Sequence, residues 1–318
     1  MANRYSGRVD HSGRERSRIV WIIGVVLLSL AVLALVYVAL TQNRAPAGAG
    51  ESQPPTTTES PVERATPTEE VTPEPAAVVA VPARVMAAVD GQRAYRAIAG
   101  SCPGDEPIVE VTEDSGSSWS SFPVSVEPAA ASVRSILPGD GNFVALVTAD
   151  SATCAPQFAR SYVAGAEWEA ADEVDTTWHL SQDATSVVAP GGNPSNPCAK
   201  PVQVATTNDT TAAVLCADAA VVMTADAGGS WSAPVAIPGA AAIAAGGSGY
   251  LVVVSGQNGC AGAQLAQVPA AADGVSQPGA CVASAASAPD NAVAQADDTV
   301  WLWSGDTVAR STDGGQTW

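Results

Sequence analysis

The sequence predicts an all-β fold, a β-propeller of about five to six blades that follows a single N-terminal transmembrane helix and a disordered linker. Three observations predict it: an eight-residue pattern that recurs in the C-terminal part, short apolar runs around each copy, and a long uncharged segment near the N-terminus. The composition agrees, because 28 Gly and 23 Pro among 318 residues suit many short strands and turns better than long helices.

The uncharged segment covers residues 19–40 and predicts a membrane-spanning helix. At about 1.5 Å per residue it reaches roughly 33 Å, which is enough to cross the apolar core of a bilayer. Five arginines precede it, so the basic tail of residues 1–18 is expected to stay in the cytoplasm. A cleaved signal peptide is the alternative, because Ala45-Pro46-Ala47 resembles a cleavage site, but the apolar part of a signal is typically about 7–15 residues. We therefore expect a single-pass signal anchor in the cell membrane, with the C-terminal domain extracytoplasmic.

Residues 41–76 form a tether that is rich in Pro, Thr and Glu and has few large apolar side chains. Such a segment cannot bury enough apolar surface to offset the entropy lost on ordering, so we expect it to be disordered. Extended at about 3.1 Å per residue, it would span roughly 100 Å. It would carry the C-terminal domain, residues 77–318, away from the bilayer.

The charge of the chain is strongly acidic beyond the uncharged segment. After residue 40 there are nine basic and thirty acidic residues, and Lys200 is the single lysine of the chain. Phosphate binding requires a cationic surface, so this balance argues against nucleic acid as a partner. The abundance of Ala, Gly and Pro, together with the scarcity of lysine, suggests a bacterial source with a high-GC genome.

All six cysteines follow the uncharged segment, and an even number on one side of a membrane predicts disulfides in an oxidising compartment. A metal site would need close pairs such as C-x-x-C, which the sequence lacks. Six cysteines allow fifteen connectivities, of which we favour pairing between sequence neighbours. The favoured pairs are Cys102 with Cys154, Cys198 with Cys216, and Cys260 with Cys281.

The repeated pattern reads Ser/Thr-x-Asp-x-Gly-x-x-Trp and occurs three times. A degenerate fourth copy keeps Ser161, Gly165 and Trp168 but has Val163 in place of the Asp. With eight Trp in the whole chain, three chance matches are not credible. The complete copies are Thr112-Asp114-Gly116-Trp119, Thr224-Asp226-Gly228-Trp231 and Ser311-Asp313-Gly315-Trp318.

Each position of the pattern suits a tight turn between two strands. The Asp can accept hydrogen bonds from backbone N–H groups that the turn leaves unpaired, and the Gly supplies a positive φ. The Trp is a large apolar anchor that holds the turn on the core. Strand-like runs surround the copies, at residues 108–111, 124–126, 143–147, 213–215, 220–223, 235–237, 250–254, 299–303 and 307–310.

With these residues, the sequence from about 84 to 318 resembles the Asp-box (BNR) repeat family. That family includes sialidases, the ectodomains of sortilin-type receptors and photosystem assembly factors. The resemblance implies a β-propeller whose Asp boxes lie at the periphery of the blades, away from the functional face. It therefore implies a structural rather than a catalytic role for Asp114, Asp226 and Asp313.

The pattern and the runs divide the domain into five modules, near 84–127, 128–180, 181–238, 239–282 and 283–318. The fourth module has no recognisable box. The run Ala77–Val81 is predicted to close the ring by pairing beside the strand near Thr307–Arg310, which would remove an exposed edge.

A catalytic set is not apparent. An exo-sialidase needs three converging arginines, a Tyr–Glu pair and an acid, but the Arg-Ile/Leu-Pro motif of that family is absent. The residues that could take part are Arg84, Arg93, Arg96, Arg134, Arg160, Arg310, Tyr95, Tyr162 and Tyr250. Each is more simply a residue of the blade surface, so we assign no catalytic residue and expect no cofactor.

Two further features have an ordinary and a functional interpretation. One is an acidic run, which we interpret in the first place as a solvated loop and in the second as a candidate calcium site. The run consists of Glu167, Glu169, Asp172, Glu173 and Asp175. Trp301 and Trp303 alternate on one strand, which favours core packing over stacking on a sugar.

These observations favour a membrane-anchored, non-catalytic propeller that binds a protein or a glycan in the cell envelope. A sialidase-like glycoside hydrolase is the alternative, and an assembly factor for a membrane complex is a third interpretation. Whether the chain is an enzyme stays open at this point, with the balance against it. The expected partners are the membrane, through the N-terminal helix, and an envelope protein or glycan.

Overall fold

The computed structural model describes residues 79–318, except 173–175, 258, 271–273, 285 and 287. The predicted tail, transmembrane helix and tether (1–18, 19–40 and 41–76) lie outside the described residues. Within the described residues, no helix is long and apolar enough to cross a membrane. The regular secondary structure of the described residues is almost wholly antiparallel β-strand, joined by turns and loops.

The strands form six consecutive sheets, here called blades A to F. Blade A holds β1 (Arg84–Ala88), β2 (Ala94–Ile98), β3 (Ile108–Thr112) and β4 (Ser120–Pro123). Blade B holds β5 (Ala130–Pro138), β6 (Val144–Asp150), β7 (Pro156–Ser161) and β8 (Glu169–Ala171). Blade C holds β9 (His179–Leu180), β10 (Val187–Val188) and β11 (Pro194–Ser195).

The remaining three blades complete the described chain. Blade D holds β12 (Pro201–Thr206), β13 (Ala212–Cys216), β14 (Ala220–Thr224) and β15 (Val235–Ala236). Blade E holds β16 (Ala240–Gly246), β17 (Gly249–Ser255) and β18 (Ala263–Pro269). Blade F follows a 3-10 turn, Ala288–Asp290, and holds β19 (Asn291–Ala296), β20 (Thr299–Ser304) and β21 (Thr307–Ser311).

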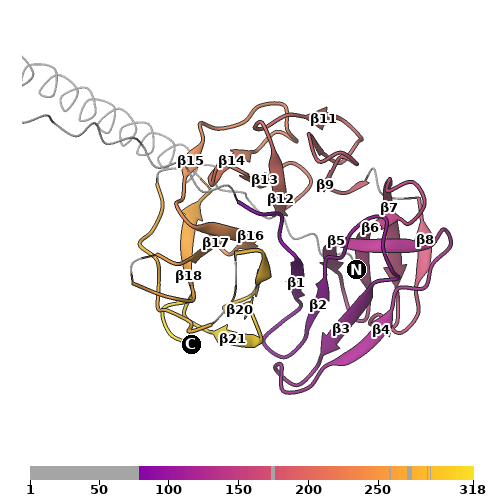
Figure 1. Ribbon diagram of the computed structural model, residues 1–318, viewed down its shortest axis with the longest axis horizontal. Coiled ribbons are helices and arrows are strands. Elements are labelled where there is room, and N and C mark those ends of the chain that lie inside the picture. The colour runs from indigo at the N-terminus through magenta and orange to yellow at the C-terminus, as the bar shows by residue number, and fades with distance from the viewer. Residues whose placement is uncertain (1–78, 173–175, 258, 271–273, 285, 287) are drawn as a thin grey trace, which may run out of the picture. The chain divides into compact units, whose positions relative to one another are not determined.

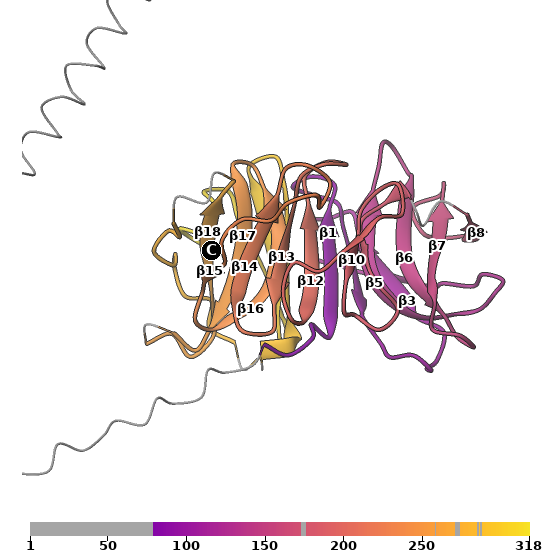
Figure 2. The same cartoon turned by 90° about the horizontal axis from the view of Figure 1, so that it is seen from above.

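The six blades are arranged in a closed ring. The innermost strands lie next to one another, with β1 beside β5 and β19, and β16 beside β19 and β12. Blade F therefore meets blade A although the two lie at opposite ends of the described chain (Figure 1). Seen from the side, the strands of blades D and E stand roughly parallel to β1 (Figure 2). The described residues form a six-bladed β-propeller.

The six sheets agree with the predicted five to six blades, but the division into five modules is one short. The missing sheet begins with β9 in module 128–180 and continues with β10 and β11 in module 181–238. This sheet is blade C, whose strands are two residues long and carry no Asp box. A two-residue strand shows no alternation of apolar and polar residues, so the pattern could not reveal it. The predicted run 124–126 is also displaced, because β4 begins at Ser120, directly after Trp119, and ends at Pro123.

The run 77–81 was predicted to close the ring beside β21, but its described part lies elsewhere. Val79 donates its backbone N–H to Ala217 O at 2.7 Å, in blade D, and not to β21. Its side chain is buried in the apolar cluster between blades D and E, with Leu215 and Tyr250. In the described residues β21 stays the outer strand of a three-stranded sheet. Burial of Val79 in this cluster explains the difference, since β21 offers a largely half-exposed edge.

The core lies between the blades, in the middle strands. Strands β13, β14 and β20 are buried along their whole length, because each blade is covered on both faces by its neighbours. Three disulfides reinforce this arrangement and have the neighbour pairing expected from the sequence: Cys102 with Cys154, Cys198 with Cys216, and Cys260 with Cys281. The first of them joins blade A to blade B.

Candidate functional site

The three complete Asp boxes fold as identical hydrogen-bonded turns. In the first, Thr112 Oγ1 donates to Asp114 Oδ1 at 2.9 Å and accepts the Gly116 N–H at 2.9 Å. Asp114 also accepts the backbone N–H and the hydroxyl of Ser118, at 2.8 and 2.6 Å. The same bonds recur around Asp226, with Thr224 and Ser230, and around Asp313, with Ser311 and Thr317.

These bonds set the ionisation of the box carboxylates. The hydroxyl of Ser118, followed by its backbone N–H and the hydroxyl of Thr112, lowers the pKa of Asp114 to about 2. The equivalent bonds from Ser230 and Thr224 lower the pKa of Asp226 to about 2, and the pKa of Asp313 is lowered as well. A carboxylate held in its charged form by turn hydrogen bonds is a poor general acid near neutral pH. The geometry supports a structural role for these three residues.

The box glycines bring each turn against the preceding blade. A Cβ added to Gly116 would lie 3.3 Å from Trp301 of blade F, and one added to Gly315 would lie 3.0 Å from Leu265 of blade E. Gly228 approaches Ser195 of blade C in the same way. The Asp boxes therefore fasten neighbouring blades to one another. Trp231 adds to this contact, since it meets Trp178 edge to face at 6.5 Å between ring centroids.

The degenerate box in blade B keeps its turn without a carboxylate. Ser161 Oγ accepts the Gly165 N–H at 2.9 Å and the Val163 N–H at 3.2 Å. Where the other boxes carry the Asp, this one exposes Val163, and its neighbour Tyr162 is also exposed. The turn hydroxyl therefore suffices to close the turn, and the missing Asp leaves an apolar spot on the rim.

A cavity of about 310 Å³ lies on the inner side of the ring, among the innermost strands of blades A to D. The cavity lies where the two-residue strands of blade C face the longer β5 and β12. Apolar side chains provide most of the wall: Val81, Pro82, Val85, Ala99, Val133, Val147, Trp178, Leu180, Ala184, Val202 and Val204. The polar side chains of the wall are Ser101, Ser132, Arg134, Ser135, His179, Gln182 and Gln203.

Arg134 is the charged group of this wall. Its side chain is half-buried, and burial lowers the pKa of its guanidinium. One of its N–H groups donates to Ser181 O at 3.4 Å. No Asp or Glu of the described residues forms an ion pair with it, and none lines the cavity.

The neutral polar groups around Arg134 retain bonding capacity. His179 is buried, and its Nδ1–H donates to Thr177 O at 3.0 Å, which leaves Nε2 for another partner. Ser135 Oγ is shielded from solvent and has no hydrogen-bond partner among the described residues. Gln203 accepts the Ile243 N–H at 2.9 Å through Oε1, and its amide N–H groups have no hydrogen-bond partner among the described residues.

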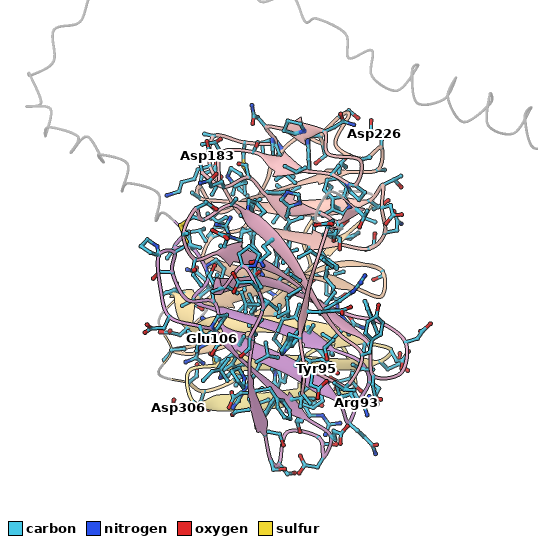
Figure 3. The ribbon with its side chains drawn as sticks, turned by 90° about the vertical axis from the view of Figure 1, so that its right-hand side faces the viewer. Arg93, Tyr95, Glu106, Asp183, Asp226 and Asp306 are labelled. Atoms are coloured by element: carbon cyan, nitrogen blue, oxygen red, sulfur yellow. A yellow bond between two sulfur atoms is a disulfide. The ribbon has the colours of Figure 1, made fainter. Side chains whose placement is uncertain are left out.

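The arginines and tyrosines that a sialidase would need are dispersed over the described residues. Arg84 and Arg96 lie over the ring of Trp303, at 4.3 and 4.7 Å from its centroid, in the seam between blades A and F. Three more arginines bind elsewhere: Arg93 pairs with Glu113, Arg160 with Glu169, and Arg310 lies over Trp301. Tyr95 and Tyr250 are buried, whereas Tyr162 is exposed. Arg93 and Tyr95 lie towards one end of the view in Figure 3, and Asp183 and Asp226 towards the other.

The acidic run after Trp168 is described in part, since Glu173 and Asp175 lie outside the described residues. Glu169 pairs with Arg160 at 2.7 Å. No group of three or more potential metal ligands (His, Cys, Asp or Glu) comes together in the described part of the chain. Trp301 and Trp303 are both buried, and Trp301 donates its indole N–H to Asp90 O across the seam at 3.0 Å.

The sequence did not predict the cavity, although one residue in it indicates a functional position. Arg134 interrupts a strand in which every other described side chain is apolar or a serine, Ala130–Pro138. A charge within such a strand is unusual unless it has a function or a partner. The contribution of His179 could not be found in this way, because its position depends on the short blade C.

Comparisons with known proteins leave the family open. No protein-family model and no curated protein matches the chain. Among solved structures, YCF48 from Cyanidioschyzon merolae is similar at 15% identity and a TM-score of 0.39, over 77% of this chain and 85% of that one. A GH74 xyloglucanase from Xanthomonas campestris is similar at 19% identity and a TM-score of 0.30, over 74% and 37% of the two chains. A Hadza microbial sialidase is similar at 14% identity and a TM-score of 0.31, over 70% and 50%. We base no conclusion about this chain on similarities of this size.

Proposed function

We propose that the chain is a non-catalytic binding module of the cell envelope and that its ligand enters the cavity among blades A to D. The cavity carries this proposal. It has a volume of about 310 Å³, apolar walls, and a few polar groups that four different blades bring together. Ligand sites in proteins have this combination of an apolar enclosure and a small number of placed polar groups.

The lining of the cavity argues against hydrolysis at this site. Glycosidases of the common types use two carboxyl groups on either side of the bond that is cleaved. The cavity wall contains Arg134, His179 and neutral polar side chains, and none of its described residues is an Asp or a Glu. Binding therefore fits this cavity better than glycoside hydrolysis.

A second hollow favours the hydrolase alternative. It has a volume of about 570 Å³ and is lined by Asp105, Glu106 and Glu110 of blade A. Two of these carboxylates already have partners, since Glu110 pairs with Arg96 at 2.8 Å and Glu106 accepts the Ser125 hydroxyl at 2.7 Å. Assays on sialosides and on envelope glycans with the wild type and with Glu110→Gln would decide this alternative, because a hydrolase at this hollow would lose its activity in the variant.

We also propose that the propeller stands outside the cytoplasm, held by the predicted helix of residues 19–40 and the tether of residues 41–76. The disulfides support this placement. All six cysteines are paired, and stable disulfides are typical of oxidising compartments. A role as an assembly factor for a membrane complex is one form that such binding would take.

The proposal is tested by capturing partners of the full-length, tagged protein from its native membranes by crosslinking and mass spectrometry. Val81→Trp would place a large side chain at the cavity wall, where Val81 is 58% exposed. Val163→Trp is the matched control, because this valine is 46% exposed and lies on the degenerate Asp box, outside the cavity lining.

We expect the wild type and Val163→Trp to capture the same partner or glycan, and Val81→Trp to lose it. Circular dichroism and melting temperature check that both variants are folded. Full capture by a folded Val81→Trp protein would show that the ligand binds elsewhere.

A further inference from the structure

We propose that the cavity binds a carboxylate carried on a small apolar body, and that Arg134 is the residue that recognises the carboxylate. This inference rests on the proposed function, because it takes the cavity as the ligand site. It goes further by naming the chemical class of the ligand and the residue that selects it.

The first observation is the isolation of Arg134 in an acidic chain. The chain has 32 acidic and 14 basic residues, so an arginine has many potential partners. Four described arginines, Arg84, Arg93, Arg96 and Arg160, have an acidic partner within 4.0 Å. Arg134 and Arg310 have none among the described residues. Arg310 lies over the ring of Trp301, whereas half-buried Arg134 has no such ring contact among the described residues either. Removing an unpaired charge from water is costly, so a ligand of opposite charge would supply the missing compensation.

The second observation is a β-bulge at Arg134. The register between β5 and β6 pairs Val133 with Thr148 and Ser135 with Val147, and shifts between them, so that Arg134 has no partner in the ladder. In a regular strand Arg134 and Ser135 would point to opposite faces. Both line the same cavity here, and bulges are known to redirect side chains next to functional sites.

The third observation is the set of neutral groups around the guanidinium. A guanidinium has five N–H donors in one plane, of which the structure uses one for Ser181 O. It matches a carboxylate in shape and can bind both of its oxygens. Ser135 Oγ is a further group of the wall without a partner among the described residues, and its hydroxyl can donate to a carboxylate. His179 Nε2 is an acceptor while Nδ1–H donates to Thr177 O, so it does not bind the carboxylate directly. One positive charge among neutral partners suits a singly charged carboxylate.

The walls determine the rest of the ligand. They are built mainly from valines, with Leu180 and Trp178, and none of the described lining residues carries a negative charge that would repel the anion. A volume of about 310 Å³ lies at the lower end of the usual range for ligand sites. The body of the ligand is therefore small and apolar. The carboxylate would belong either to a free acid or to the end of a peptide chain.

The experiment uses isothermal calorimetry on the full-length protein in detergent, with 4-methylpentanoate and its neutral isostere 4-methylpentanamide as probes. The variants are Arg134→Gln, Arg134→Lys, Val81→Trp and, as a control arginine outside the cavity, Arg160→Gln. We expect the wild type and Arg160→Gln to bind the acid at least about tenfold more tightly than the amide, because a charge-assisted bidentate bond is lost in the amide. Arg134→Gln should lose this preference and leave amide binding unchanged. Arg134→Lys should restore it in part, since a lysine keeps the charge but not the planar fork.

A stability measurement separates this role from a structural one. Because Arg134 is half-buried and has no acidic partner among the described residues, Arg134→Gln should keep or raise the melting temperature of the free protein while it weakens acid binding. A structural arginine would give the opposite result, a lower melting temperature.

Equal binding of acid and amide by the wild type, or binding of neither, would overturn the inference. Loss of the acid preference with a clearly lower melting temperature would overturn it as well. The proposed function would still hold after such a result if, in the crosslinking experiment, Val81→Trp loses the captured partner and Arg134→Gln keeps it. The source of the carboxylate follows from two more probes, N-acetyl-Ala-Leu and its C-terminal amide: tighter binding of this peptide acid than of 4-methylpentanoate assigns a chain end, and weaker binding assigns a free acid.

Discussion

The carboxylate of each complete Asp box is shared by two hydroxyl groups, one on each side of it in the chain. Thr224 donates to Asp226 Oδ1 and Ser230 donates to Asp226 Oδ2, at 2.8 and 2.7 Å. The sequence pattern includes the first hydroxyl but leaves the seventh position open. A hydroxyl stands there in all three complete boxes, as Ser118, Ser230 and Thr317. That recurrence was visible in the sequence, and its purpose became clear from the geometry.

These residues predict how stability depends on pH. The pKa values of Asp114 and Asp226 are lowered to about 2, whereas an unfolded chain protonates its Asp side chains near about 3.9. A lowered folded-state pKa favours the folded state above the unfolded value, and this stabilisation is lost as the pH falls towards the folded value. We expect the urea midpoint to change little between about pH 7 and 5 and to fall between about pH 4 and 2.

The control for this prediction is the combined variant Asp114→Asn, Asp226→Asn and Asp313→Asn. It should be less stable at neutral pH, and its urea midpoint should fall less steeply in the acid range. A variant with the same acid-range slope as the wild type would assign the loss to other carboxylates, among which hydrogen bonds also lower the pKa of Asp90, Asp150 and Asp183.

At the scale of elements, strand β5 shows where sequence reasoning ends. Strands such as β14 and β20 were predicted because their apolar residues stand in short, unbroken runs. Strand β5 is longer, at nine residues, but was not among the predicted runs. Ser132, Arg134 and Ser135 interrupt its apolar residues, so it shows neither an unbroken apolar run nor a regular alternation. One of the two irregularities in its register lies at Arg134, which lines the cavity. Arg134 therefore both hides this strand from prediction and supplies the charged group of the cavity.

The Asp-box turns give a second prediction at this scale. Gly116 has φ +85°, and a Cβ there would meet Trp301 of blade F at 3.3 Å. Gly141 has φ +64° and has nothing within 4 Å of such a Cβ. In both Gly→Ala variants the alanine must adopt a positive φ, which costs roughly 1–2 kcal/mol of folding free energy. In Gly116→Ala the new methyl group also crowds the Trp301 side chain of blade F. We expect Gly116→Ala to lower the free energy of unfolding by about 1 kcal/mol more than Gly141→Ala, measured by urea unfolding. Equal losses would show that the box turn does not fasten the blades.

At the scale of the whole molecule, the ring arrangement brings blade F against blade A and places the cavity among blades A to D. The seam between blades A and F is held by Arg84 and Arg96 against Trp303, contacts worth about 0.5–2 kcal/mol each. The sequence predicted the class of fold from three local turns, because those turns recur. It did not predict how six unequal blades share the space at the centre. That depends on the length of every blade at once, and above all on the short blade C.

The disulfides provide the prediction at this scale. Cys102 and Cys154 line the cavity and have a sequence separation of 52, whereas Cys260 and Cys281 lie outside the cavity lining and have a separation of 21. Loop-closure entropy makes the two bonds worth about 4 and about 3 kcal/mol. Replacing either pair by alanines should therefore lower the urea midpoint, but only the Cys102→Ala/Cys154→Ala protein should also bind the cavity ligand more weakly. Calorimetry with 4-methylpentanoate makes the comparison, and equal weakening in both variants would contradict the assignment.

The most direct test of the cavity as the ligand site is photo-crosslinking in native membranes. A benzophenone amino acid is placed in the full-length protein at Gln182, which is exposed and lines the cavity, and in a second protein at Val163, which lies on the degenerate Asp box. We expect a specific adduct from position 182 on illumination and none from position 163. An adduct from position 163 with none from position 182 would contradict this expectation.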